Sequence, residues 1–162
     1  MRVNEDYRKY YNIGKTIGEG FGIVYESTKI DTNEKRVIKI IDKNLIKNTF
    51  NVPSDKEIKS YIDSFYKEIE NMKKCGEEDN INIVKFYEYF ETKDEFAIVM
   101  ELCDDNMLKF ISKRKSKLPF AEFKEIIKQL NKAFKIMTRN KIIYRDLKLE
   151  NILIKYTTIN NI

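Results

Sequence analysis

One stretch near the end of the chain gathers side chains that can do chemistry. Residues 143–151 read Ile-Tyr-Arg-Asp-Leu-Lys-Leu-Glu-Asn, with apolar Ile142 before them and Ile152–Ile154 after them. A buried strand or helix cannot hold charged and amide groups so closely spaced unless they are paired or take part in a reaction. The stretch is therefore either a surface loop between two short strands or a loop that does chemistry.

A run of glycines is a second candidate. Gly18, Gly20 and Gly22 lie between two segments of strand character. Glycines at such a place let the backbone turn sharply, and they let its N–H groups approach a phosphate closely. The alternative is an ordinary glycine hairpin, which the run alone favours.

Lys39 lies in a β-branched run that predicts a strand. Its neighbours two positions away, Val37 and Ile41, are apolar, so Lys39 shares a face with core residues. A lysine on such a face needs a partner. The alternative is an edge-strand lysine that discourages aggregation.

Glu68 is the candidate partner of Lys39. It belongs to a predicted helix and lies roughly 70° from the centre of the apolar stripe of that helix, whereas Glu70 points nearly the opposite way. Glu68 can therefore turn toward a sheet while Glu70 faces water. The alternative is a glutamate at the rim of the stripe with no partner.

The elements that must position these residues are strands first and helices later. Residues 1–9 are polar and predict a loose arm. The pattern predicts strands at 11–17, 23–28, 36–41, 86–90 and 96–100. A capping-box sequence at Ser54–Glu57 starts a helix. A short helix is expected from Met107 to about Lys113, and a longer one from near Pro119, a favoured first-turn residue. The stripe of the first helix is Ile58, Tyr61, Ile62, Phe65, Ile69 and Met72; that of the last is Phe123, Ile126, Ile127, Leu130, Phe134 and Met137.

Composition excludes several classes of site. The 162 residues are 42% hydrophobic, enough for a buried core, and include no histidine. Zinc sites and His-based triads are excluded on that ground. Two cysteines without C-x-x-C spacing fit a reducing compartment. The net charge of +5 is interpreted as a solvated surface, and the run 113–117 as a surface loop rather than a nucleic-acid patch. With no signal peptide and no spanning segment, a soluble cytoplasmic protein without membrane or nucleic-acid partners is expected.

Together these features resemble the catalytic domain of eukaryotic protein kinases of the Ser/Thr type. The catalytic loop of that family is H-R-D-L-x-x-x-N, and residues 144–151 match it with Tyr144 in place of His. The glycine run resembles G-x-G-x-x-G-x-V but is one residue short, between Gly20 and Phe21. The order of glycine loop, strand lysine, helix glutamate, hinge and catalytic loop is similar across residues 10–155.

The resemblance implies a site for ATP and Mg²⁺. Lys39 would pair with ATP phosphates and with Glu68. Met100 would be the gatekeeper, the backbones of Glu101 and Cys103 would bind adenine, and Asn106 falls where the family often places a ribose-binding residue. The implied ATP-binding residues are Ile17, Gly18, Gly20, Gly22, Val24, Lys39, Glu68, Met100, Glu101, Cys103 and Asn106.

The resemblance also assigns roles in the loop of residues 143–151. Asp146 would accept the proton of the substrate hydroxyl, and Asn151 would help to hold Mg²⁺. Lys148, two residues after Asp146, is typical of Ser/Thr kinases and would neutralise charge on the transferred phosphate. Arg145 would tie the loop to a phosphorylated or acidic activation segment. The expected partner is a protein substrate with Ser or Thr.

The implied fold is α+β and kinase-like. It comprises an arm (1–9), an N-lobe and hinge with a five-stranded antiparallel sheet and one regulatory helix (10–103), and the start of a helical C-lobe (104–162). The D-F-G motif that follows in the family does not occur in the sequence. We therefore expect a truncated domain with impaired phosphoryl transfer and an exposed apolar stripe on its last helix. The alternative is a non-catalytic, kinase-like module that binds nucleotide, a regulatory protein or a chaperone.

Overall fold

The computed structural model describes residues 2–20, 22–44, 55–76 and 81–156. The chain forms two compact units. One comprises residues 1–77 and 85–102, and the other comprises residues 78–84 and 103–162. Within the described ranges, no helix combines the length and the apolar character that crossing a bilayer requires.

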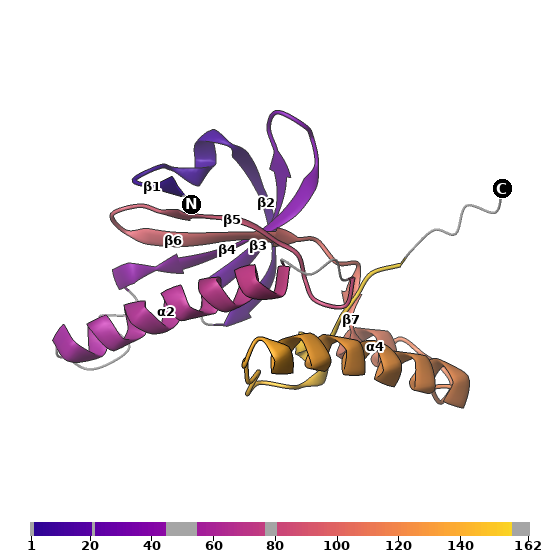
Figure 1. Ribbon diagram of the computed structural model, residues 1–162. Helices are drawn as coiled ribbons and strands as arrows, with labels where there is room; N and C mark the ends of the chain where they lie inside the picture. Colours follow the sequence, from indigo (N-terminus) through magenta and orange to yellow (C-terminus); the bar gives the residue numbers. More distant parts are fainter. Residues whose placement is uncertain (1, 21, 45–54, 77–80, 157–162) are drawn as a thin grey trace. The chain divides into compact units, whose positions relative to one another are not determined.

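A β-sheet forms the centre of the N-terminal unit (Figure 1). Five strands pair antiparallel, and their order across the sheet is β5-β6-β4-β3-β2. They are β2 (Tyr11–Gly20), β3 (Gly22–Lys29), β4 (Lys35–Asp42), β5 (Phe86–Glu91) and β6 (Glu95–Glu101). The predicted five-stranded antiparallel sheet is confirmed. The two-residue strand β1 (Arg2–Val3), which the sequence did not predict, pairs in parallel with β5.

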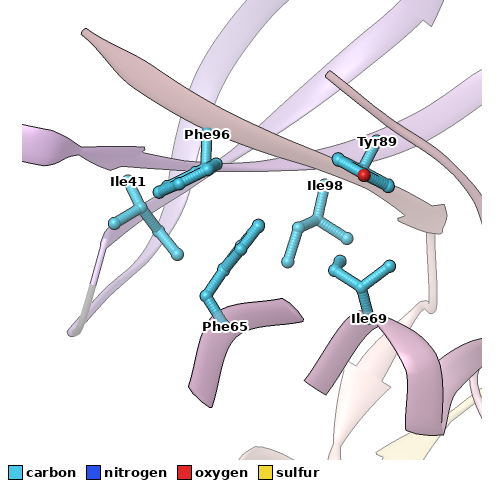
Figure 2. Packing of buried hydrophobic residues seen from close by; sticks show 6 residues of the cluster. All are labelled: Ile41, Phe65, Ile69, Tyr89, Phe96 and Ile98. Atoms are coloured by element: carbon cyan, nitrogen blue, oxygen red, sulfur yellow. The ribbon is translucent and has the colours of Figure 1, made fainter. Parts of the chain in front are cut away.

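Helix α2 (Asp55–Gly76) covers one face of this sheet, and its buried residues Phe65 and Ile69 belong to the predicted apolar stripe. The ring of Phe65 stacks on that of Phe96 with the centroids 4.1 Å apart. Figure 2 shows the buried cluster that joins helix and sheet, which comprises Ile41, Phe65, Ile69, Tyr89, Phe96 and Ile98. The predicted capping residue Ser54 lies outside the described residues.

The N-terminal segment covers the opposite face of the sheet. Tyr7, in the 3₁₀ turn η1 (Tyr7–Lys9), is completely buried and packs with Tyr11 against Phe90. The Tyr7 hydroxyl and the Arg8 guanidinium both donate to the Glu95 carboxylate, at 3.2 and 2.8 Å. The expectation of a loose arm is therefore wrong. This segment is needed because residues 96–99 of β6 are apolar without alternation, so both faces of that strand must be covered.

The C-terminal unit contains two helices and a short two-stranded ladder. Its elements are β7 (Asp105–Asn106), α3 (Met107–Ser112), α4 (Phe120–Arg139), the 3₁₀ turn η2 (Leu149–Asn151) and β8 (Leu153–Ile154). β7 pairs antiparallel with β8. Both predicted helices are confirmed, although Pro119 caps α4 instead of lying in its first turn.

The buried residues of helix α4 differ from its predicted apolar stripe. Ala133 and Ile136, which are buried, are not members of that stripe. Among the stripe residues, Phe123 and Ile127 are 48% and 47% exposed, and the other four are half-buried. The predicted exposure of the stripe is therefore confirmed for Phe123 and Ile127.

Candidate active site

Four strands bring several of the candidate nucleotide-binding residues into one row. Gly18 of β2 lies opposite Val24 of β3, Val24 lies opposite Lys39 of β4, and Lys39 lies opposite Ile98 of β6. Residues directly opposite one another in a sheet share a face. Because Ile98 packs in the cluster that contains Phe65 of α2, the row faces that helix.

Lys39 and Glu68 meet on this face. Lys39 Nζ lies 3.6 Å from Glu68 Oε1, whereas Glu70 pairs with Lys67 and Lys74 of its own helix at 3.1 and 2.7 Å. The Glu68 side chain therefore turns toward the sheet, as its position at the margin of the apolar stripe of α2 led us to expect. Burial, together with the negative charge of Glu68, raises the pKa of the Tyr61 phenol to about 12.

A polar network that the sequence reasoning missed ties α2 to the sheet. The Tyr66 hydroxyl donates to Glu91 Oε2 at 2.5 Å, and Lys43 Nζ contacts Glu91 Oε1 at 2.8 Å. Lys43 also donates to the Thr92 carbonyl at 2.7 Å. Burial, followed by the hydrogen bond to Glu91, raises the pKa of Tyr66. These partners are far apart in sequence and match no motif, so no local sequence pattern predicts their contacts.

The glycine hairpin is short and tightly closed. Gly20 pairs directly with Gly22, and two register shifts occur earlier in β2, between Ile13 and Gly18. Gly22 has φ +94°, and a Cβ placed there would lie 2.6 Å from the Ile40 carbonyl oxygen. This close approach of the backbone is why position 22 requires glycine. Ile17, another candidate, is exposed.

The segment expected to bind adenine follows β6. Met100 packs at the edge of the cluster beneath α2, and the Glu101 N–H donates to the Lys85 carbonyl at 2.9 Å. Cys103 is half-buried. Asn106 caps α3, because its side-chain oxygen accepts the Lys109 N–H at 2.9 Å. That cap gives Asn106 a structural role in addition to the one proposed for ribose.

In the loop of residues 143–151, two candidate side chains, Asn151 and Lys148, converge on the carboxylate of a third, Asp146. Asn151 Nδ2 donates to Asp146 Oδ2 at 2.7 Å and to the Asp146 backbone carbonyl at 2.9 Å. Lys148 Nζ lies 3.2 Å from the same Oδ2. The Asp146 side chain is 65% exposed. The loop therefore holds its carboxylate in a defined place and leaves it open to an incoming group.

A tight turn at Arg145 positions the Asp146 carboxylate. Arg145 has φ +63°, and the Asp146 N–H donates to the Tyr144 carbonyl at 2.9 Å. A non-glycine residue in the left-handed region is uncommon and strained, and such residues cluster at functional sites. The sequence did not reveal this turn, since Arg has no preference for it.

Backbone hydrogen bonds anchor the chain that follows the loop. Asp104 N–H donates to the Ile154 carbonyl at 2.9 Å, and Met107 N–H donates to the Ile152 carbonyl at 2.8 Å. The Tyr156 N–H donates to the Asp104 carboxylate at 2.7 Å. The loop is thus fixed to the start of α3 by strand pairing.

The comparison with known families is decisive. The family described as "Protein kinase domain" matches residues 11–161. This chain belongs to the protein kinase family. The match includes the glycine hairpin, the Lys39–Glu68 pair and the loop that carries Asp146.

Individual relatives are also kinases. Serine/threonine-protein kinase 33 from Bos taurus is 31% identical over 154 residues, which cover 94% of this chain and 29% of the relative. Calcium-dependent protein kinase 5 from Plasmodium berghei is 34% identical over a region that covers 93% of this chain and 24% of the relative. The carbon catabolite-derepressing protein kinase from Candida tropicalis is 32% identical over a region that covers 89% of this chain and 21% of the relative. The chain thus spans less than a third of the length of these relatives.

Members of the protein kinase family generally use ATP and Mg²⁺, and residues of this chain fit both. Lys39 offers a cation for phosphate on the face that it shares with Gly18 and Val24. Mg²⁺ prefers oxygen ligands and few of them from protein, and Asn151, the residue expected to help hold the metal, offers an amide oxygen while its amide nitrogen donates to Asp146. The described residues contain no group of three or more Cys, Asp or Glu that could hold a metal ion.

Proposed function

We propose that this chain is the nucleotide-binding and catalytic-loop part of a protein kinase that transfers the γ-phosphate of ATP to Ser or Thr hydroxyls. The observation that carries the proposal is the convergence of Lys148 and Asn151 on the exposed carboxylate of Asp146. A carboxylate held in this way is available to a substrate hydroxyl. Because the chain belongs to the protein kinase family, we assign this arrangement to phosphoryl transfer.

On the nucleotide side, Lys39 binds the phosphates and Glu68 holds Lys39 in place. The 3.6 Å separation of the pair supports these roles. Backbone N–H groups of Gly18, Gly20 and Gly22 approach the phosphates, and Ile17, Val24 and Met100 pack on the base. The backbones of Glu101 and Cys103 bind adenine, and Asn106 binds ribose. We accordingly assign residues 10–103 to the N-lobe with its hinge.

On the acceptor side, Asp146 takes up the proton of the substrate hydroxyl as the oxygen attacks phosphorus. Lys148 faces the transferred phosphate and offsets its negative charge. Asn151 positions Asp146 through its amide N–H groups and offers its oxygen to Mg²⁺. When bound, Mg²⁺ neutralises charge on the phosphates. Lys148, placed two residues after Asp146, favours Ser and Thr over Tyr as acceptors.

The test is a transfer assay on the full gene product that contains this chain. Matched peptides carry a single Ser, Thr or Tyr, and phosphate is located by mass spectrometry. We expect phosphate on Ser and Thr, and we expect Asp146→Asn to lower the rate about a thousandfold because the proton acceptor is lost. Asp63→Asn, at an exposed position of α2, is the matched control and should retain the wild-type rate. Transfer to Tyr alone, or an unchanged rate in Asp146→Asn, contradicts the proposal.

A second function is a non-catalytic module that binds nucleotide or a protein partner. The observation that favours it is the glycine hairpin, in which Gly20 and Gly22 pair directly and leave a shorter loop over the phosphates. This function predicts ATP binding without transfer by the full gene product. Sequencing the transcript past the codon for Ile162 adds a direct check, since an Asp-Phe-Gly triplet within about 30 codons favours the active kinase.

A further inference from the structure

Five cationic side chains form a stripe along α4. At ~100° per residue they fall within an arc of about 80° on the helix surface, and all five are exposed. Glu122 and Glu125, the acidic residues of the helix, lie outside this arc. The basic stripe comprises Lys124, Lys128, Lys132, Lys135 and Arg139.

Helix α2 carries the same number of cations but arranges them differently. Asp63 and Glu70 project among its lysines, and Lys67 and Lys74 both pair with Glu70. That mixture is the usual pattern of a solvated helix face. In the basic stripe, Lys128 pairs with the flanking Glu125 at 3.5 Å. Lys124, Lys132 and Lys135 have no ion-pair partner among the described residues. The stripe is therefore not an ordinary mixed surface.

The spacing of the stripe works against the helix that carries it. Successive members are three or four residues apart, and like charges at these spacings repel and destabilise a helix. The imbalance extends beyond α4. Residues 103–162 contain fourteen basic and six acidic side chains, whereas residues 1–102 contain seventeen basic and twenty acidic side chains. The whole positive excess of the chain thus lies in its C-terminal part. An anionic partner on the stripe would relieve the repulsion.

We propose that the basic stripe is a docking surface for an acidic, extended segment of a protein partner. From Lys124 to Arg139 the stripe is about 22 Å long, with a cation every ~6 Å. Alternate side chains of an extended peptide are ~6.6 Å apart, so about seven residues with acidic groups at every second position match it. A membrane or a nucleic-acid duplex presents a broad anionic surface, whereas this stripe is one row wide. Docking here is a property separate from phosphoryl transfer.

Binding of a fluorescein-labelled peptide of about eight glutamates, followed by anisotropy at low salt, tests the proposal. The peptide has no hydroxyl acceptor, so the result does not depend on kinase activity. We expect the triple variant Lys128→Glu, Lys132→Glu, Lys135→Glu to raise the Kd at least about tenfold. Added salt should weaken wild-type binding because it screens the charges.

The matched control reverses the same number of charges on α2, with Lys56→Glu, Lys59→Glu and Lys67→Glu. Its Kd should stay within about twofold of wild type, since only overall charge has changed. Equal losses in the two triple variants would show that overall charge alone attracts the peptide, and would overturn the proposal. Tighter binding of phosphatidylserine vesicles or single-stranded DNA than of the peptide, with the same sensitivity to the stripe variant, would also overturn it.

A neutral triple variant, with Gln at positions 128, 132 and 135, keeps the test valid if the reversed variant fails to fold. Removing the repulsion should leave the melting temperature of the neutral variant at or above that of wild type. Its peptide affinity should still fall several-fold. An unchanged affinity in this folded variant would contradict the proposal.

Discussion

Gly22 is the residue whose replacement the structure tolerates least. Its φ of +94° is strained for any residue with a Cβ, and that Cβ would lie 2.6 Å from the Ile40 oxygen and 2.8 Å from Ile41 Cγ1. Because the first of these is a backbone atom of β4, it cannot move aside without disturbing the sheet. We expect Gly22→Ala to lower the free energy of unfolding by about 3 kcal/mol, measured by urea denaturation.

Gly20 provides the matched control for this prediction. It pairs with Gly22 across the same hairpin, but a Cβ at Gly20 meets nothing within 4 Å. Gly20→Ala should therefore change the free energy of unfolding by no more than about 0.5 kcal/mol. Equal losses for the two variants would show that the hairpin is not closed as described.

At the level of whole elements, the polar network described above links helix α2 to the sheet. Tyr66 on the helix and Lys43 after β4 share the carboxylate of Glu91 on β5. This network lies on the helix that carries Glu68, so it helps to keep Glu68 within reach of Lys39. Tyr66→Phe should lower the free energy of unfolding by about 1 kcal/mol at pH 7 because one hydrogen bond is lost.

The pH dependence of this difference is a stricter test. Burial raises the folded-state pKa of Tyr66 above the unfolded value of 10.0. The tyrosine is protonated in both states below pH 10, so its contribution is complete there. As the pH rises past 10, only the unfolded state releases the proton, and the contribution is lost. The difference between wild type and Tyr66→Phe should therefore shrink above pH 10 in urea titrations. A difference that grows with pH would contradict the assignment.

Sequence patterns predicted the elements whose geometry is local. The alternation of β4 and the stripe of α2 placed Lys39 and Glu68 on facing surfaces, and the structure brings the pair together. The resemblance to the kinase catalytic loop implied that Asp146 and Asn151 act in one loop, and the two residues are hydrogen-bonded. The prediction for Lys39 and Glu68 succeeded because the period of a strand or helix determines which side chains share a face.

Other features depend on contacts that no local pattern encodes. Residues 1–9 look polar, yet Tyr7 is buried because one aromatic ring fits against Phe90 on the uncovered face of the sheet. The continuous apolar run of β6 was a signal that this face needed cover. The left-handed turn at Arg145 has no sequence signature, since arginine has no preference for it; a backbone hydrogen bond from the Asp146 N–H to the Tyr144 carbonyl closes it.

On the scale of the whole molecule, the chain separates chemistry between two units. Lys39 and Glu68 belong to the N-terminal unit, and Asp146, Lys148 and Asn151 belong to the C-terminal unit. Each set is assembled inside its own unit by contacts that do not require the other. Under the proposed function, the nucleotide-binding set can therefore be tested by itself.

The most direct test of the proposed function is to find which lysine meets the phosphates of ATP. An acyl-phosphate derivative of ATP transfers its acyl group to a lysine amine beside the phosphates, and mass spectrometry identifies the modified residue. With the full gene product, we predict that Lys39 is acylated and that excess Mg·ATP prevents it. Lys35, exposed on the same strand, is the control and should show no protection. Acylation of Lys39 no greater than that of Lys35, or acylation that ATP does not reduce, would contradict the assignment of this site to nucleotide.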